Sequence, residues 1–348
     1  MAHLIRDSFD FYGATSEAAG LWDGFGTALL SANTRFVVGQ SCAPTTTLNQ
    51  VGFIKTFTGN SSTVFLSFAW GMSTALGATN RFQEFRFYDS ATIQCSLVFD
   101  NDGTVSLRLG DNGAVIAGPF TCFSGSASIA WTHLQFKIVF SNTVGEFHMR
   151  RNGNTVDDAT ATGLDNCSNA NEFINKIDTK CLQSASSQIY IDDFWMFNNT
   201  VVAGEPSDWL GDIRAVQIMP NSDSVVAFSR SAGATNFSNV DELISASADY
   251  VFSSAAGTVD QYGNAGFAIA PSSILGLAIR EIGLKTDAGV RTAGIRIKSG
   301  ATTVDSAGVA IGTTAQSVVM NADVDPNTGV AWTAANVAAL LFGPRVVT

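Results

Sequence analysis

The sequence predicts an all-β protein, with an antiparallel jelly-roll sandwich followed by a second, smaller β-rich domain that carries a short C-terminal helix. Three observations predict this. Apolar residues recur at every second position in many short segments, which is the period of a half-buried strand. Gly, Asn and Asp separate these segments at roughly eight-to-twelve-residue spacing, as in sandwiches and barrels. The 348 residues are too many for one ordinary sandwich and suit two domains.

The clearest strand pattern lies in residues 131–153. From Leu134 to Phe140 the apolar residues fall on every second position, with polar residues between them. Asn152-Gly153 is the dipeptide that a tight type I′ hairpin turn requires, because both central residues need positive φ. This stretch therefore predicts two antiparallel strands and the start of a third.

Similar patterns predict the other strands of the first half. The strand at residues 64–70 is apolar on both faces, which indicates a central position in a sheet. Asp193 interrupts the apolar row of a late strand, so we expect its carboxylate to be buried and bonded to backbone amides. Residues 171–177 are expected to form a short helix. Further strands are expected around residues 9–11, 34–38, 82–87, 93–99, 105–109 and 189–197.

A shift in composition marks the domain boundary. Residues 198–212 contain Asn, Gly and Pro, and after them aromatic residues become rarer while Ala, Val, Ser and Ile become more frequent. We therefore expect a first domain at residues 1–200, a linker at 201–212 and a second domain at 213–348.

The last part of the second domain carries the signals of a short helix. Thr333 suits the N-cap position, and the Ala and Leu residues after it are strong helix formers. Gly343 suits the C′ position, and Pro344 follows where the helix stops.

The composition argues against two classes of partner. The net charge is −11 and no run of basic residues appears, which excludes a phosphate-binding surface for nucleic acid. No apolar run is long enough to span a bilayer, and the N-terminal residues lack the apolar core of a signal peptide. We therefore expect no membrane insertion and folding in a cytoplasm, where the five cysteines stay reduced. A disulfide between Cys167 and Cys181 is the less favoured alternative.

Three segments of the first half resemble the concanavalin-like, laminin-G-like jelly rolls. Trp131-Thr-His-Leu resembles the opening of a strand in this superfamily. The segment from Gly145 to Gly153 resembles the strand that follows, which ends in an Asn-Gly turn. Tyr190-Ile-Asp-Asp-Phe-Trp-Met-Phe resembles its closing strand. The resemblance covers roughly residues 5 to 200 and implies a sandwich of this size.

The second half is similar to a domain of tailed-bacteriophage virion proteins. The similarity covers residues 205–348. It implies a chain that is assembled in the host cytoplasm and placed in a virion, with copies of itself and other virion proteins as partners. The residues that carry it are Trp209-Leu-Gly-Asp-Ile-Arg-Ala, Asn236-Phe, Val240-Asp-Glu, Asp249-Tyr-Val, Lys285-Thr-Asp-Ala-Gly-Val-Arg and the segment that begins Asp325-Pro-Asn-Thr-Gly.

The search for catalytic residues yields one candidate. The sequence has no G-x-S-x-G elbow of a serine hydrolase. Glycoside hydrolases need two carboxyl groups across a cleft, and Glu84 is the one acidic residue inside a suitable aromatic strand. The favoured interpretation of Glu84 is nevertheless an outward-facing strand residue. His133 and His148 are interpreted as polar residues of a solvent face rather than as a metal pair.

Two kinds of binding residue are also considered. Asp100 and Asp102 are the candidates for calcium, an ion that some laminin-G-like jelly rolls hold at the rim of the sandwich, while turn formation is the favoured alternative. Trp22, Trp70 and Trp131 are the candidates for stacking on a glycan, while a place in the core is the favoured alternative.

The leading hypothesis is a non-enzymatic structural component of a tailed-phage virion, in the tail, fibre, collar or capsid decoration. The jelly roll would be displayed for attachment to a host-surface polysaccharide or for decoration, and the second domain would mediate assembly, with a trimer as the expected state. One alternative is a virion-associated glycan depolymerase of the jelly-roll type. Another is a purely structural cement or collar protein without a ligand.

Overall fold

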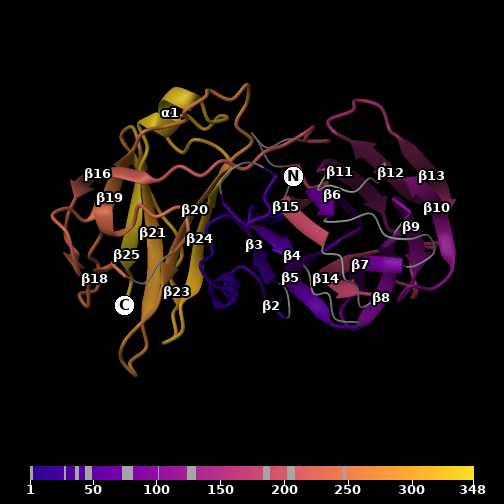
Figure 1. Cartoon of the computed structure of the whole chain (residues 1–348), viewed down its shortest axis with the longest axis horizontal. Coiled ribbons are helices and arrows are strands. Elements are labelled where there is room, and N and C mark those ends of the chain that lie inside the picture. Colours follow the sequence, from indigo (N-terminus) through magenta and orange to yellow (C-terminus); the bar gives the residue numbers. More distant parts are fainter. Residues whose placement is uncertain are drawn as a thin grey trace. The chain divides into compact units, whose positions relative to one another are not determined.

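The computed structural model of the chain folds into two compact units, each built of antiparallel strands (Figure 1). Strands make up most of the regular structure in the described part of the chain, so the predicted all-β class is confirmed. None of the helices there has the length and apolar character needed to cross a bilayer. The structure describes residues 3–26, 29–35, 39–43, 49–72, 81–100, 102–123, 131–182, 189–201, 208–245 and 248–348.

The first unit is an antiparallel jelly-roll sandwich of two sheets. The eight-stranded sheet has the order β13-β12-β11-β6-β15-β4-β3, with β1 paired to β15. Its strands are β1 (His3–Asp7), β3 (Leu29–Ser31), β4 (Ser41–Ala43), β6 (Thr63–Met72), β11 (Thr132–Val139), β12 (Gly145–Arg151), β13 (Ala159–Leu164) and β15 (Ile189–Asn198).

The seven-stranded sheet has the order β10-β9-β8-β7-β14-β5-β2. The expected helix at residues 171–177 is wrong, because most of that segment belongs to a strand that pairs on both sides with β7 and β5. Tertiary pairing overrides local preference there. The strands are β2 (Gly24–Phe25), β5 (Val51–Ser61), β7 (Arg81–Asp89), β8 (Thr92–Asp100), β9 (Thr104–Leu109), β10 (Val115–Thr121) and β14 (Ile174–Cys181).

Aromatic rings from both sheets fill the core of the jelly roll. Phe68 of β6 is fully buried, and its ring centroid lies 5.0 Å from that of Phe85 and 6.0 Å from that of Phe136. The predicted central strand at residues 64–70 is β6, which pairs with β11 on one side and β15 on the other. Both of its faces are buried, which explains its unbroken apolar character.

The second unit contains smaller sheets around its own core. The main sheet has the order β16-β19-β25-β21-β22, with β23 paired to β21, and two further pairs are β17-β18 and β20-β24. The core includes Ile279, Ile295, Val318 and Trp332. The elements are η1 (Thr15–Ala18), β16 (Pro220–Val225), β17 (Ser229–Arg230), η2 (Phe237–Asn239), β18 (Val251–Phe252), β19 (Gln261–Asn264), β20 (Leu277–Gly283), β21 (Thr292–Ser299), β22 (Thr302–Asp305), β23 (Val309–Ala310), β24 (Gln316–Ala322), α1 (Ala334–Ala338) and β25 (Leu341–Val346).

The predicted C-terminal helix is confirmed, but it is shorter than its signals suggest. Thr333 is the N-cap, and its hydroxyl accepts a hydrogen bond from the Asn336 amide at 3.1 Å. The helix ends at Ala338, and Gly343 and Pro344 lie inside β25 rather than after a helix. Pairing of β25 with β21 and β19 decides this.

The N-terminal segment 11–21 belongs to the second unit, although the residues on both sides of it belong to the first. The Ser317 amide of β24 donates to the Ala19 carbonyl at 2.8 Å, and Arg280 of β20 donates to the Tyr12 hydroxyl at 3.1 Å. The expected first domain at residues 1–200 is therefore interrupted, because these bonds form between residues far apart in the sequence.

Residues 208–215, part of the expected linker and the start of the expected second domain, pack on the first unit. The Trp209 ring meets Phe65 edge-on at 5.8 Å, and Phe65 stacks on Phe197 at 5.0 Å. The Ala215 amide donates to the Asp193 carboxylate at 2.7 Å. The segment is therefore a structured part of the jelly roll, and the second unit resumes at Val216.

Candidate functional site

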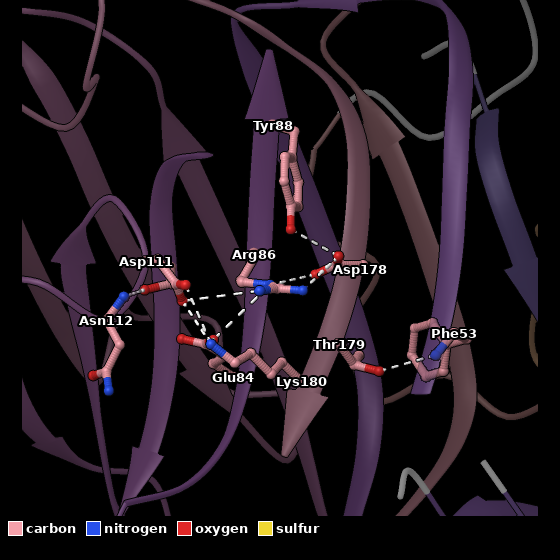
Figure 2. A network of polar contacts seen from close by, with 10 residues as sticks. Phe53, Glu84, Arg86, Tyr88, Asp111, Asn112, Asp178, Thr179 and Lys180 are labelled. Carbon is pink, nitrogen blue, oxygen red and sulfur yellow. Dashed lines mark hydrogen bonds and ion pairs between the residues drawn. The ribbon is translucent and has the colours of Figure 1, made fainter. Parts of the chain in front are cut away.

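A row of charged side chains lies on the outer face of the seven-stranded sheet. Along β7, Phe85 and Phe87 point into the core and are fully buried. Because side chains alternate along a strand, Glu84 and Arg86 point to the opposite face. In the pairing with β14, Lys180 lies opposite Glu84 and Asp178 lies opposite Arg86. Figure 2 shows these side chains converging with Asp111, which comes from the turn between β9 and β10.

Arg86 and Asp178 form the fixed part of this site. Arg86 donates from Nε and Nη2 to the two oxygens of Asp178, both at 2.7 Å, and the Tyr88 hydroxyl donates to the same carboxylate at 2.8 Å. Burial opposes the charged form of Arg86, but the hydrogen bonds and charge of Asp178 hold its pKa above the ordinary value. This ion pair is therefore charged, geometrically defined and nearly dry.

Glu84 is a buried carboxyl group that lies close to two cations and to the Asp111 carboxyl. Its residue is 0% exposed, and neither carboxyl oxygen makes a hydrogen bond. The nearest cations are Lys180 Nζ at 3.7 Å and Arg86 Nε at 3.9 Å, both beyond hydrogen-bond distance. Burial, together with the neighbouring Asp111 carboxyl, raises the pKa of Glu84 to about 8. Glu84 is therefore mainly protonated at neutral pH.

Asp111 and Lys180 form the exposed edge of the site. Lys180 Nζ lies 3.2 Å from each oxygen of Asp111. The Asp111 side chain is 46% exposed, whereas that of Lys180 is 15% exposed. Burial acts to raise the pKa of Asp111, but Glu84 and Lys180 lower it overall. Asp111 is therefore the carboxylate and Glu84 the neutral acid of this pair of carboxyl groups.

Replacing Glu84 with glutamine is expected to remove an alkaline loss of stability. A folded-state pKa raised from 4.5 to about 8 contributes stability that is complete below the lower value and is lost as pH rises through the higher one. Between about pH 5 and about pH 9 the wild type should lose about 4 kcal/mol relative to Glu84→Gln, since the change spans roughly three pKa units and one pKa unit is about 1.4 kcal/mol. Urea unfolding at the two pH values measures this. Parallel pH profiles for the two proteins would contradict it.

The structure places two of the three candidate tryptophans where they cannot stack on a glycan. Trp22 is 3% exposed and Trp70 is 1% exposed. The Trp22 ring centroid lies 4.5 Å from that of Phe53, and the Trp70 ring stacks on Phe99 at a centroid distance of 4.3 Å. Both indole rings therefore pack inside the core. The expectation of glycan stacking is corrected for these two. Trp131 is half-buried, and its stacking on a glycan stays a prediction.

The candidate calcium residues hold a turn together. Asp102 accepts hydrogen bonds from the Thr104 amide at 3.0 Å and the Thr104 hydroxyl at 2.6 Å, and the Gly103 amide donates to the Asp100 carbonyl. This is the behaviour of Asx residues in tight turns. Over the described ranges, no group of three or more His, Cys, Asp or Glu residues is arranged to hold a metal ion.

The two histidines do not behave alike. His133 is fully buried rather than on a solvent face, and its Nδ1 lies 3.7 Å from the Asp212 carboxylate. Its Nε2 lies 3.1 Å from the Ser67 hydroxyl, and burial lowers its pKa to about 4. His148 is partly exposed and contacts Asp157 at 2.7 Å and Glu146 at 3.2 Å. Neither histidine joins the charged row.

Asp193 is buried, as predicted, and bonded to a backbone amide. It also forms an ion pair with Arg35 at 3.2 Å. The five cysteines are buried free thiols, so the alternative disulfide between Cys167 and Cys181 does not form.

The sequence alone indicated Glu84 but none of its companions. Arg86 and Tyr88 follow at two-residue spacing, which signals a shared face but not a site. Asp178 and Lys180 lie more than 90 positions further along the chain, and only the pairing of β14 with β7 brings them close. Asp111 stands before Asn112-Gly113, so its pattern indicated a turn.

Comparison with known proteins shows likeness only at the level of structure. No protein-family model matches the chain, and no curated protein matches it. Solved structures do match. The chain is similar to the cellulose-induced protein Cip1, with 16% identity over 57% of this chain and 100% of that chain at a TM-score of 0.40. It is also similar to the metal-free carbohydrate recognition domain of Emp46p, with 9% identity over 56% of this chain and 96% of that chain at a TM-score of 0.38.

A third similar structure is the receptor-binding domain of botulinum neurotoxin mosaic serotype C/D. The identity is 12%, over 58% of this chain and 48% of that chain, at a TM-score of 0.40. This chain thus spans about half the length of the neurotoxin chain. The likeness concerns the fold, and none of the three names refers to a phage particle.

Proposed function

We propose that the jelly-roll unit binds a glycan on the outer face of its seven-stranded sheet, at the site formed by Glu84, Arg86, Asp111 and Lys180. The observation that carries this proposal is the fully buried carboxyl of Glu84, neither oxygen of which makes a hydrogen bond. A buried polar group without a hydrogen bond costs roughly 1–3 kcal/mol, so a fold that needed only a scaffold gains nothing from it. Such groups with shifted pKa values concentrate at functional sites.

The chemistry of the site suits a sugar. It offers an exposed carboxylate, Asp111, and an ammonium group, Lys180, which are an acceptor and a donor for hydroxyl groups, and the buried acid of Glu84 lies 3.7 Å behind Lys180. The flat strands below it hold these groups on a rigid surface, and Arg86 and Asp178 fix that surface by two charged hydrogen bonds.

We further propose a role in a tailed-phage virion, with the jelly roll displayed for attachment to a host-surface polysaccharide. Its support is the sequence similarity of residues 205–348. The partners in this proposal are copies of the chain, as a trimer, and other virion proteins. Two results together would contradict this role. The chain would be absent from mass spectra of purified particles, and the purified chain would stay monomeric at high concentration.

Substituting Lys180 with alanine is expected to weaken glycan binding about tenfold, because one charged hydrogen-bond donor is worth about 1.4 kcal/mol. A glycan array identifies the ligand with the wild-type chain, and calorimetry compares the variants. Lys137→Ala is the matched control, since Lys137 forms a similar ion pair with Glu146 at 3.1 Å on the other sheet. Equal affinities for wild type and Lys180→Ala would reject this site. An array without any ligand, with firm binding to particles, would favour the structural cement or collar protein.

A second candidate function is a glycan depolymerase. It is favoured by the neutral Glu84 beside the ionised Asp111, since glycoside hydrolysis uses one acid and one carboxylate. Glu84 is fully buried, so it would have to become accessible to act on a glycosidic oxygen. Shortening of a bound polysaccharide by the wild type, and its loss in Glu84→Gln with binding retained, would establish this function. No shortening by the wild type removes it.

A further inference from the structure

The anionic member of the exposed edge can be replaced at little cost. Asp111 comes from a turn, its side chain is 46% exposed, and it bonds Lys180 through both oxygens at 3.2 Å. Ion pairs with such exposure contribute only about 0–1 kcal/mol. Arg86, by contrast, is held by Asp178 in two bonds of 2.7 Å and is only 9% exposed. Lys180 is therefore the cation of this site whose partner can be exchanged.

The carboxyl group behind this ion pair does not neutralise Lys180. Glu84 is neutral at neutral pH and lies 3.7 Å from Lys180, too far for a hydrogen bond. Direct cross-strand pairs extend the same face from Arg86 through Ser96 to Arg108. The face also carries Asp111 and Asp178, so with Glu84 protonated the three cations Arg86, Arg108 and Lys180 exceed these two carboxylates by one, in a chain of net charge −11. A polyanion repelled elsewhere would be attracted here.

We infer that the ligand of this site is an acidic polysaccharide, whose uronate carboxylate binds Lys180 in place of the Asp111 carboxylate. The inference rests on the proposed function and names its ligand class. Asp111 presents two carboxylate oxygens to Lys180 at equal distance, which is the geometry that a sugar carboxylate would reproduce. Asp111 then acts as an internal competitor that holds the place of the ligand in the free protein.

The test is calorimetry with a galacturonic acid hexamer and with its carboxyl-reduced counterpart, at about pH 6, where Glu84 is protonated. The wild type should bind the acidic hexamer at least about tenfold more tightly than the reduced one. Asp111→Asn should tighten binding of the acidic hexamer several-fold, because the competing carboxylate is gone, and should leave the reduced hexamer unchanged. The double variant Asp111→Asn with Glu84→Gln keeps Glu84 from ionising in the absence of Asp111 and should tighten binding further.

The matched control is Asp212→Asn, which removes the same charge from a side chain of similar exposure, 43%, in the segment 208–215 of the same unit. It should not change the affinity for either hexamer. Equal tightening by Asp212→Asn, or weaker binding by Asp111→Asn, would overturn the inference. Preference for the reduced hexamer would also overturn it while leaving the proposed glycan-binding function intact. Absence of any glycan ligand for the wild type on the array would overturn the proposed function, and the inference with it.

Discussion

Arg86→Ala is expected to destabilise the jelly-roll unit by about 3–5 kcal/mol, because removing one partner of a buried ion pair leaves the other charge uncompensated. Asp178 is only 3% exposed, so water cannot replace the lost partner, and its carboxylate would keep the hydrogen bond from the Tyr88 hydroxyl. Urea unfolding at neutral pH measures the loss. Since Arg86 also lies 3.9 Å from both Glu84 and Asp111, glycan binding should fall in the same variant even where it remains folded.

Arg151→Ala provides the control for this prediction. Arg151 donates to Asp158 at 2.9 Å on the other sheet, but its side chain is 33% exposed. Its removal should cost less than about 1 kcal/mol, as exposed ion pairs do. If the two arginine variants lose similar stability, burial is not what gives the Arg86 pair its importance.

The second large effect is expected at Phe68, at the centre of the aromatic core. Phe68→Ala should cost about 3–5 kcal/mol, from lost burial and from the cavity that remains. The ring is 0% exposed and lies within 6.2 Å, centroid to centroid, of Trp70, Phe99 and Phe194. It therefore touches residues of both sheets, and its loss loosens the contact between them. Thermal or urea unfolding of the purified chain measures this.

A graded control is available in the same unit. Phe120 of β10 is half-buried and stacks on Phe147 at 5.4 Å. Phe120→Ala should cost about 1 kcal/mol, the contribution of a single aromatic pair with partial burial. A loss at Phe68 no larger than that at Phe120 would show that the core collapses around the missing ring.

Strand alternation predicted the fold well where local pattern and tertiary structure agree. The alternating segments from Leu134 to Phe140 and around Trp70 are strands β11 and β6, and they pair with each other. The predictions from alternation and capping failed where pairing with a distant strand decides the secondary structure. The segment around Ile174 became a strand because β7 and β5 accept its backbone, and Gly343 lies in β25 for the same reason.

The domain boundary shows the same limit. The composition change near residue 200 marks a real division, but segments 11–21 and 208–215 each belong to the unit opposite to the expected one. Their placement depends on hydrogen bonds such as that from Ser317 to Ala19 and on the ring contact of Trp209 with Phe65. Composition averages over a window and does not register such single contacts.

By itself, the sequence determined the all-β class, the capped helix at Thr333 and the buried role of Asp193, because each depends on a local pattern of polarity or on one residue's chemistry. It also identified Glu84, but as one acidic residue in an aromatic strand. Only the tertiary structure decided that Glu84 is buried and that Lys180 and Asp111 face it. The physical reason is strand register. A charge becomes part of a site through the strand paired beside it, and that strand lies far away in the sequence.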